Sequence, residues 1–161
     1  MKAKIFFLLL TVLIALISGS VVYQLDRGRR NLLVVSAQSG DLDKVKILVQ
    51  NGFSINQPMP SNFGFTPLIA AIYSGSTNVA YFLIDAGADV NLPSNDGTTP
   101  LMWAVQHGDS AVPLVQYLIR HGARIDIKDK DGITVLGYAE SIPPKPALVK
   151  VLEEAELKSQ H

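Results

Sequence analysis

The histidines are the residues best suited to chemistry in this sequence of 161 residues. His107 and His121 each stand directly before a glycine that would end a helix, where an imidazole favours the negative end of the helix dipole. The third histidine, His161, is the last residue. None of them clusters with carboxylates at the spacing of metal ligands, so we expect no metal site at these residues.

A second candidate is the acidic cluster of Asp126, Asp129 and Asp131, whose carboxylates could suggest calcium. Its spacing lacks the glycine and the distal glutamate of a calcium-binding loop. We therefore expect these aspartates to be solvated loop residues without a bound cation.

The motifs that usually carry catalysis are missing. The sequence has no Gly-rich phosphate loop, no Gly-x-Ser-x-Gly elbow and no His-Glu-x-x-His helix. It also has no cysteine, which excludes disulfides, thiol catalysis and cysteine-bound metal. We predict no catalytic residue and no cofactor, and hence a protein that is not an enzyme.

The charge distribution separates residues 1–30 from the rest of the chain. Five of the 14 Lys and Arg and one of the 14 Asp and Glu fall there, which leaves nine basic and 13 acidic residues in 31–161. Because phosphate binding needs a basic face, we expect no nucleic acid partner for this mildly acidic domain.

The segment Ile5 to Leu25 contains no charged residue and is flanked by basic residues on both sides. A helix of this length spans about 30 Å, one hydrocarbon core. Two interpretations stay open: a single-pass transmembrane helix, or a signal peptide cleaved near Ser20. We favour the anchor, because apolar residues resume after Ser20 and Tyr23 stands where an interfacial aromatic would lie.

A basic N-terminus ahead of a first apolar segment usually stays in the cytoplasm, although the charges on the two sides are nearly balanced. We therefore expect a bacterial inner-membrane protein with residues 31–161 in the periplasm. The alternative is a soluble periplasmic or secreted domain, released by cleavage near Ser20.

The rest of the chain repeats itself at a regular interval. Thr66-Pro67-Leu68, Thr99-Pro100-Leu101 and Thr134-Val135-Leu136 each follow a glycine by two residues. Threonine caps a helix, proline suits its first turn, and a later glycine can end it in a left-handed conformation. A period of about 33 residues with these signals predicts stacked helix-turn-helix units.

Two units, 62–91 and 95–126, resemble the ankyrin repeat closely, and 32–56 and 130–157 resemble it in degenerate form. The resemblance implies an all-α solenoid of about four units in a domain of residues 31–161. The histidine that commonly follows Thr-Pro-Leu in this family is replaced by Ile69, Met102 and Gly137. We therefore expect stacking to rest more on apolar burial, with modest stability.

The resemblance also implies a binding surface made by the loop tips and the exposed side of each first helix. Phe63 and Phe65 are notable, because aromatics anchor interfaces, although one of them could instead fold back onto residues 57–61. For Trp103 we favour packing in the core. The partner-binding residues predicted in this way are Asn62, Phe63, Phe65, Tyr73, Ser74, Asn95, Asp96, Thr98, Gln106, His107, Lys130, Asp131, Ile133 and Ser141.

The leading hypothesis is a non-catalytic module, tethered at a membrane through Ile5 to Leu25, that binds another protein. A second hypothesis is an immunity or inhibitor protein that neutralises an effector or enzyme. A third is an accessory subunit or weak hydrolase, which would need a concave pocket with convergent carboxylates.

Overall fold

The computed structural model describes residues 31–60, 63–141 and 145–159. The predicted membrane helix Ile5 to Leu25 and the cleavage site near Ser20 lie outside this part. In the part that is described, no helix is long and apolar enough to cross a membrane.

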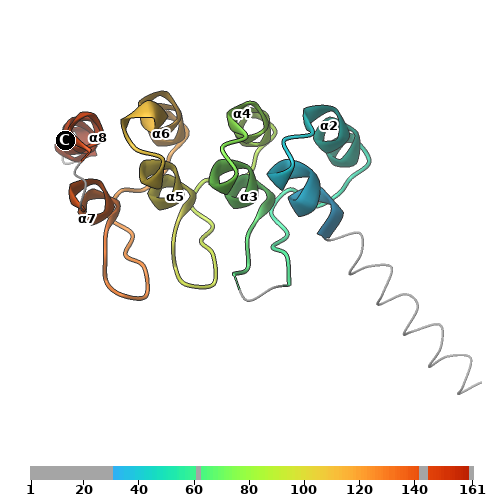
Figure 1. The fold of residues 1–161 in the computed structure, drawn as a ribbon, viewed down its shortest axis with the longest axis horizontal. Coiled ribbons are helices and arrows are strands. Elements are labelled where there is room, and N and C mark those ends of the chain that lie inside the picture. Colours follow the sequence, from blue (N-terminus) through green and yellow to red (C-terminus); the bar gives the residue numbers. More distant parts are fainter. Residues whose placement is uncertain (1–30, 61–62, 142–144, 160–161) are drawn as a thin grey trace, which may run out of the picture.

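The described chain is a row of paired helices, confirming the all-α repeat, with an isolated antiparallel bridge between Lys128 and Thr134. Figure 1 shows two parallel rows, with long loops projecting from the side of the first helices. Residues 31–38 pair with α2 (Leu42–Gln50), and α3 (Pro67–Tyr73) with α4 (Thr77–Asp85). α5 (Pro100–Gln106) pairs with α6 (Val112–Arg120), and α7 (Val135–Glu140) with α8 (Pro146–Ser159).

Each projecting loop leads into a helix through a threonine cap. The Thr66 and Thr99 hydroxyls accept hydrogen bonds from the amides of Ile69 and Met102, at 3.2 and 3.3 Å. Thr134 caps α7 in the same way at 3.4 Å, although Val135 replaces the proline. The cap satisfies an amide that has no partner within the helix, so α7 begins where the sequence predicts.

The glycines end the helices as predicted. Gly75 and Gly108 follow the first helices at φ +74° and +77°, and Gly87 and Gly122 follow the second helices at +90° and +88°. The third repeat has two more residues between its helices than the second, and this longer segment contains a short 3₁₀ helix, η1 (Asp109–Ala111), ahead of α6. The insertion is thus absorbed between the two helices of one repeat.

The core lies between the two rows of helices. Ala70, Ala71 and Ala104 are fully buried, and their small size lets each first helix approach its neighbours. Larger core residues, among them Leu83, Leu101 and Leu118, fill the space between repeats. On α8, Lys150, Glu153 and Glu154 are exposed, which gives the last helix the polar outer face that a terminal repeat needs.

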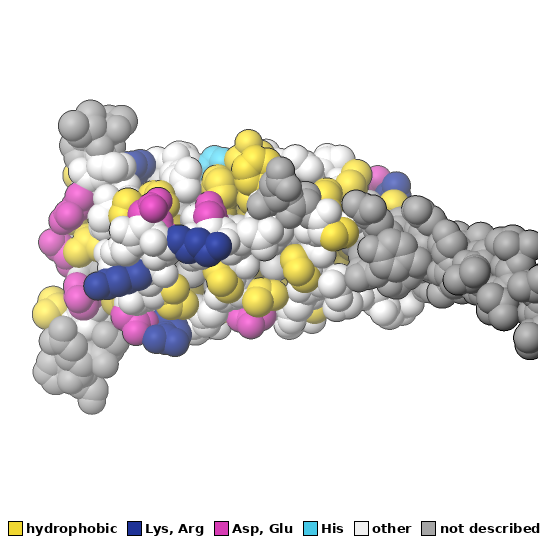
Figure 2. Space-filling view, turned by 90° about the horizontal axis from the view of Figure 1, so that it is seen from below, with side chains coloured by type: hydrophobic (Ala, Val, Ile, Leu, Met, Phe, Trp, Pro, Cys, Tyr) yellow, Lys and Arg dark blue, Asp and Glu magenta, His cyan; other side chains and the backbone are white. Residues whose placement is uncertain are grey.

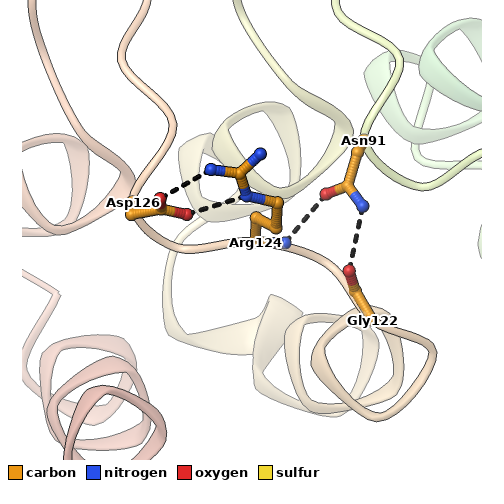
Figure 3. Close-up of polar contacts among 4 residues, drawn as sticks. All are labelled: Asn91, Gly122, Arg124 and Asp126. Carbon is orange, nitrogen blue, oxygen red and sulfur yellow. Dashed lines mark hydrogen bonds and ion pairs between the residues drawn. The ribbon is translucent and has the colours of Figure 1, made fainter. Parts of the chain in front are cut away.

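Asparagine side chains add polar bonds between repeats. Asn91 donates to the Gly122 carbonyl at 2.9 Å and accepts from the Arg124 amide at 2.8 Å (Figure 3). Asn56 accepts from the Asp89 amide at 2.8 Å, one repeat earlier. Stacking therefore includes hydrogen bonds that the expectation of mainly apolar stacking left out, because the asparagine that closes one repeat reaches the turn of the next.

Replacing Asn91 by alanine tests this bridge. Two hydrogen bonds are lost at a partly exposed site where water can compensate, so we expect the free energy of unfolding to fall by about 1 kcal/mol. Urea denaturation followed by circular dichroism measures the change. Asn91→Asp keeps the acceptor for the Arg124 amide but loses the donor to the Gly122 carbonyl, so its stability should lie between those of the parent chain and the alanine variant. An alanine variant as stable as the parent chain would show that the Asn91 bridge does not stabilise the stack.

Candidate protein-binding surface

Three loops form one side of the molecule: loop A (57–65), loop B (92–98) and loop C (127–133). Each is closed by a backbone hydrogen bond of 2.9–3.0 Å, in loop A from Met59 to Phe65. Neighbouring loops are joined by bonds from the Asn95 amide to the Phe63 carbonyl and from the Lys130 amide to the Asp96 carbonyl, at 2.9 and 3.0 Å. These bonds fix the loops as one continuous edge.

Four aromatic rings gather where loop A meets the first helices; we call Phe63, Phe65, Tyr73 and Trp103 the aromatic cluster. The Phe65 ring lies 5.5 Å from Phe63 and 5.3 Å from both Tyr73 and Trp103, between ring centroids. Phe63 is 67% exposed and Tyr73 49% exposed. The alternative was that one of the two phenylalanines folds back onto residues 57–61; the Phe65 ring instead packs on Tyr73 of α3 and Trp103 of α5.

Figure 2 looks onto the loop tips. Hydrophobic side chains are spread over this face, with one group at its upper edge near the middle, whereas charged side chains of both signs concentrate toward its C-terminal half. Apolar side chains with polar ones beside them are the usual composition of a protein interface.

Trp103 links the aromatic cluster to loop B. Its Nε1 donates to the Ser94 hydroxyl at 3.4 Å, and that hydroxyl donates to Asp96 at 2.6 Å. Desolvation acts to raise the pKa of Asp96, but the hydrogen bonds from Ser94 and Thr98 outweigh it and lower the pKa. Trp103 is half-buried, so it both packs and presents an edge to the surface, where the sequence favoured core packing alone.

One repeat later, the same arrangement recurs with different residues. Tyr138 occupies the position of Trp103, four residues after the capping threonine, and donates to Asp129 at 2.7 Å. Asp129 also accepts from the amides of Ile133 and Asp131 at 2.8 and 3.0 Å, and it is only 9% exposed. The prediction that Asp129 is a solvated loop carboxylate is therefore wrong.

The structure brings most of the predicted contact residues onto this side of the molecule. Thr98 is 3% exposed, so its prediction as a contact residue is wrong: almost none of its surface is open to a partner. Asn62 lies outside the described residues. The hydroxyls of Ser74 and Ser141 are bound to the carbonyls of Ala71 and Tyr138. The remaining exposed members are Phe63, Tyr73, Asn95, Asp96, Gln106, His107, Lys130, Asp131 and Ile133.

His107 and His121 lie where the sequence places them, and His161 lies outside the described residues. His107 and His121 are exposed C-cap residues of α5 and α6, and His121 stands 3.8 Å from Asp85. Within the described ranges, no group of three or more acidic or histidine side chains could hold a metal ion. A hollow of about 330 Å³ between the second and third repeats is lined by His107, Tyr81, Thr77, Ser110 and apolar residues but by no carboxylate. This hollow therefore lacks the convergent carboxylates that the hydrolase hypothesis would need.

Stacked helix pairs joined by a continuous edge of loops define a repeat protein with an extended surface. Residues 7–94 and 86–158 match the family model described as ankyrin repeats (3 copies). The chain belongs to the ankyrin-repeat family.

Three curated relatives are similar to this chain. An ankyrin repeat protein of fowlpox virus is 31% identical over 117 residues, which cover 73% of this chain and 33% of the viral protein. Human ankyrin repeat and KH domain-containing protein 1 is 35% identical over 69% of this chain and 4% of its own. Mouse ankyrin repeat and SOCS box protein 6 is 29% identical over 82% and 31%. The chain thus spans about a third or less of these relatives.

Proposed function

We propose that this protein binds another protein through the aromatic cluster and the edges of loops B and C. Ankyrin repeats are protein-interaction modules, generally without catalysis. The observation that carries the proposal is the pair of exposed rings, Phe63 and Tyr73, held against Phe65 and Trp103. Aromatic side chains that are already ordered bind at low entropic cost and dominate interface energies.

Cross-linking in the native membrane or extract tests the surface. A photoreactive phenylalanine analogue at Phe63 or Tyr73 is expected to give an adduct of one discrete mass, whereas the same group at exposed Glu153 on α8 gives none. Equal yields at all three positions would contradict the proposal.

Once the adduct is identified, Phe63→Ala should weaken binding about tenfold, as expected for an interface anchor. Isothermal titration with the purified partner measures the affinity. Leu157→Ala, which removes another exposed apolar side chain on α8, is the matched control and should leave the affinity unchanged. A loss of similar size in both variants would place the binding surface elsewhere.

We further propose that Ile5 to Leu25 tethers the module in a bacterial inner membrane, with the repeats on the periplasmic side. The uncharged run from Ile5 to Leu25 supports a tether, because its length matches a hydrocarbon core. Resistance to alkaline extraction tests the tether, and protease accessibility in spheroplasts tests the side. Release of a chain that begins after Ser20 would instead favour a cleaved signal.

A further inference from the structure

The N-terminal end of the stack presents two large apolar side chains. Val35, on the helix of residues 31–38, is 49% exposed, and Ile47, on α2, is 55% exposed. They belong to different helices of one repeat.

Corresponding positions in later repeats make the contacts between repeats. Val35 in the first repeat and Trp103 in the third hold the same position, five residues before the glycine that ends a first helix. The Trp103 ring packs on Phe65 and Tyr73 of the preceding repeat. Five residues before the glycine that ends a second helix stand Ile47 and Tyr117.

The Tyr117 ring packs on Tyr81, 4.7 Å away, and its hydroxyl donates to Asp85, both on the preceding α4. Val35 and Ile47 therefore occupy stacking positions, and in the described part of the chain no repeat precedes them.

Lys44 makes the N-terminal face of the first repeat unsuited to packing against a further repeat. Val79 and Leu114, eight residues before the closing glycine, are buried, and Leu114 lines the hollow between its repeat and Tyr81 of the one before. The first repeat has Lys44 at this position, and it is exposed. Stacking an apolar helix there would desolvate the ammonium group, which is costly without a charged partner.

Apolar side chains beside lysines suit the boundary between lipid and water, where the ammonium group reaches the headgroups. Lys44 on α2 is preceded in the sequence by Arg27, Arg29 and Arg30, which lie outside the described residues. Between residues 26 and 44 these four basic residues stand against Asp26, Asp41 and Asp43, and the Asp41 carboxylate is engaged as the cap of α2.

We infer that the N-terminal face of the first repeat, marked by Val35, Ile47 and Lys44, docks on the surface of an anionic lipid bilayer. This inference rests on the tether proposed above. If Leu25 ends the membrane span, the six peptide steps to residue 31 reach at most about 20 Å, so this face is held close to the headgroups. Docking also orients the stack, with the aromatic cluster beyond the first repeat and away from the bilayer.

Site-specific labelling of the full-length chain tests the docking, because the sequence has no cysteine of its own. Val35→Cys and Ile47→Cys carry an environment-sensitive fluorophore in vesicles of phosphatidylcholine with phosphatidylglycerol. Ile133→Cys on loop C, also apolar and exposed, is the matched control. Labels at 35 and 47 should be quenched by spin-labelled lipid and shielded from aqueous iodide, and the label at 133 should not.

Lys44→Gln should lower the ratio of docked to undocked protein about fivefold, the effect of one basic residue near an anionic surface. High salt or pure phosphatidylcholine should act in the same direction. Circular dichroism confirms that each variant is folded.

The outcomes separate docking from the tether. A chain that resists alkaline extraction but leaves labels 35 and 47 open to iodide overturns the docking and keeps the tether. A chain that is extracted overturns the tether itself. Shielding of labels 35 and 47 that persists in detergent would mean that the chain's own N-terminal residues cover this face. Shielding that rises with protein concentration would mean that a second copy covers it. Either result would overturn docking on lipid.

Discussion

An Asp129→Ala variant is expected to lose about 3 kcal/mol in free energy of unfolding, because a buried carboxylate that accepts three hydrogen bonds disappears. The Tyr138 hydroxyl and the amides of Ile133 and Asp131 lose their acceptor together. Loop C then loses the carboxylate that binds two amides of its turn. Urea denaturation of parent and variant measures the loss.

Two variants separate the parts of this effect. Tyr138→Phe removes a single hydrogen bond and should cost about 1 kcal/mol. Asp129→Asn keeps an acceptor for the loop amides and should lie between the parent and the alanine variant. If the alanine variant lost no more than Tyr138→Phe, the two amide bonds would contribute nothing to stability.

The same carboxylate gives the domain an acid-sensitive contribution to stability. The hydrogen bond from Tyr138 lowers the pKa of Asp129 below its ordinary value of 3.8; desolvation opposes this, and the Ile133 and Asp131 amides add to it. Because the folded pKa lies below the unfolded one, the contribution is complete above the unfolded value. It is lost as the pH falls through the folded value. The Asp129→Asn variant should therefore lose less stability than the parent chain on acidification below pH 3.8.

A Gly97→Ala variant is expected to lose about 3 kcal/mol, since strain from a positive φ and a clash with fixed backbone add up. Gly97 has φ +87°, and a methyl group there would meet the Asp129 Cα and the Lys130 amide nitrogen, each at 3.0 Å. Loop C would have to move, which would weaken the bond from the Lys130 amide to the Asp96 carbonyl. Thermal and urea unfolding measure the change.

Gly132 provides the matched control. It holds the same turn position with φ +79°, but among the described atoms none outside its own neighbours lies within 4 Å of an added methyl group. Gly132→Ala should cost only the strain of positive φ, about 1 kcal/mol. Equal losses at both positions would show that the contact between loops B and C contributes nothing.

Much of the fold could be predicted from the sequence because its signals are local. The threonine caps at Thr66 and Thr99 and the helix-ending glycines act within a few residues of their own position. The binding surface was predictable in outline, since exposed loop residues such as Phe63 follow from the repeat register. The burial of Thr98 could not be predicted, because a threonine in a loop can be buried or exposed and the residue type does not distinguish the two.

The sequence by itself determined where the helices begin and end, because caps and turns depend on the dihedral preferences of adjacent residues. Only the tertiary structure decided that Asp129 is buried, that Trp103 completes the aromatic cluster, and that Gly97 differs from Gly132. Each of these depends on a neighbouring repeat or loop, as when loop C lies against Gly97. In a stacked protein such contacts join residues about one repeat apart in the sequence. A local sequence pattern does not show which side chain of the neighbouring repeat lies opposite a given residue.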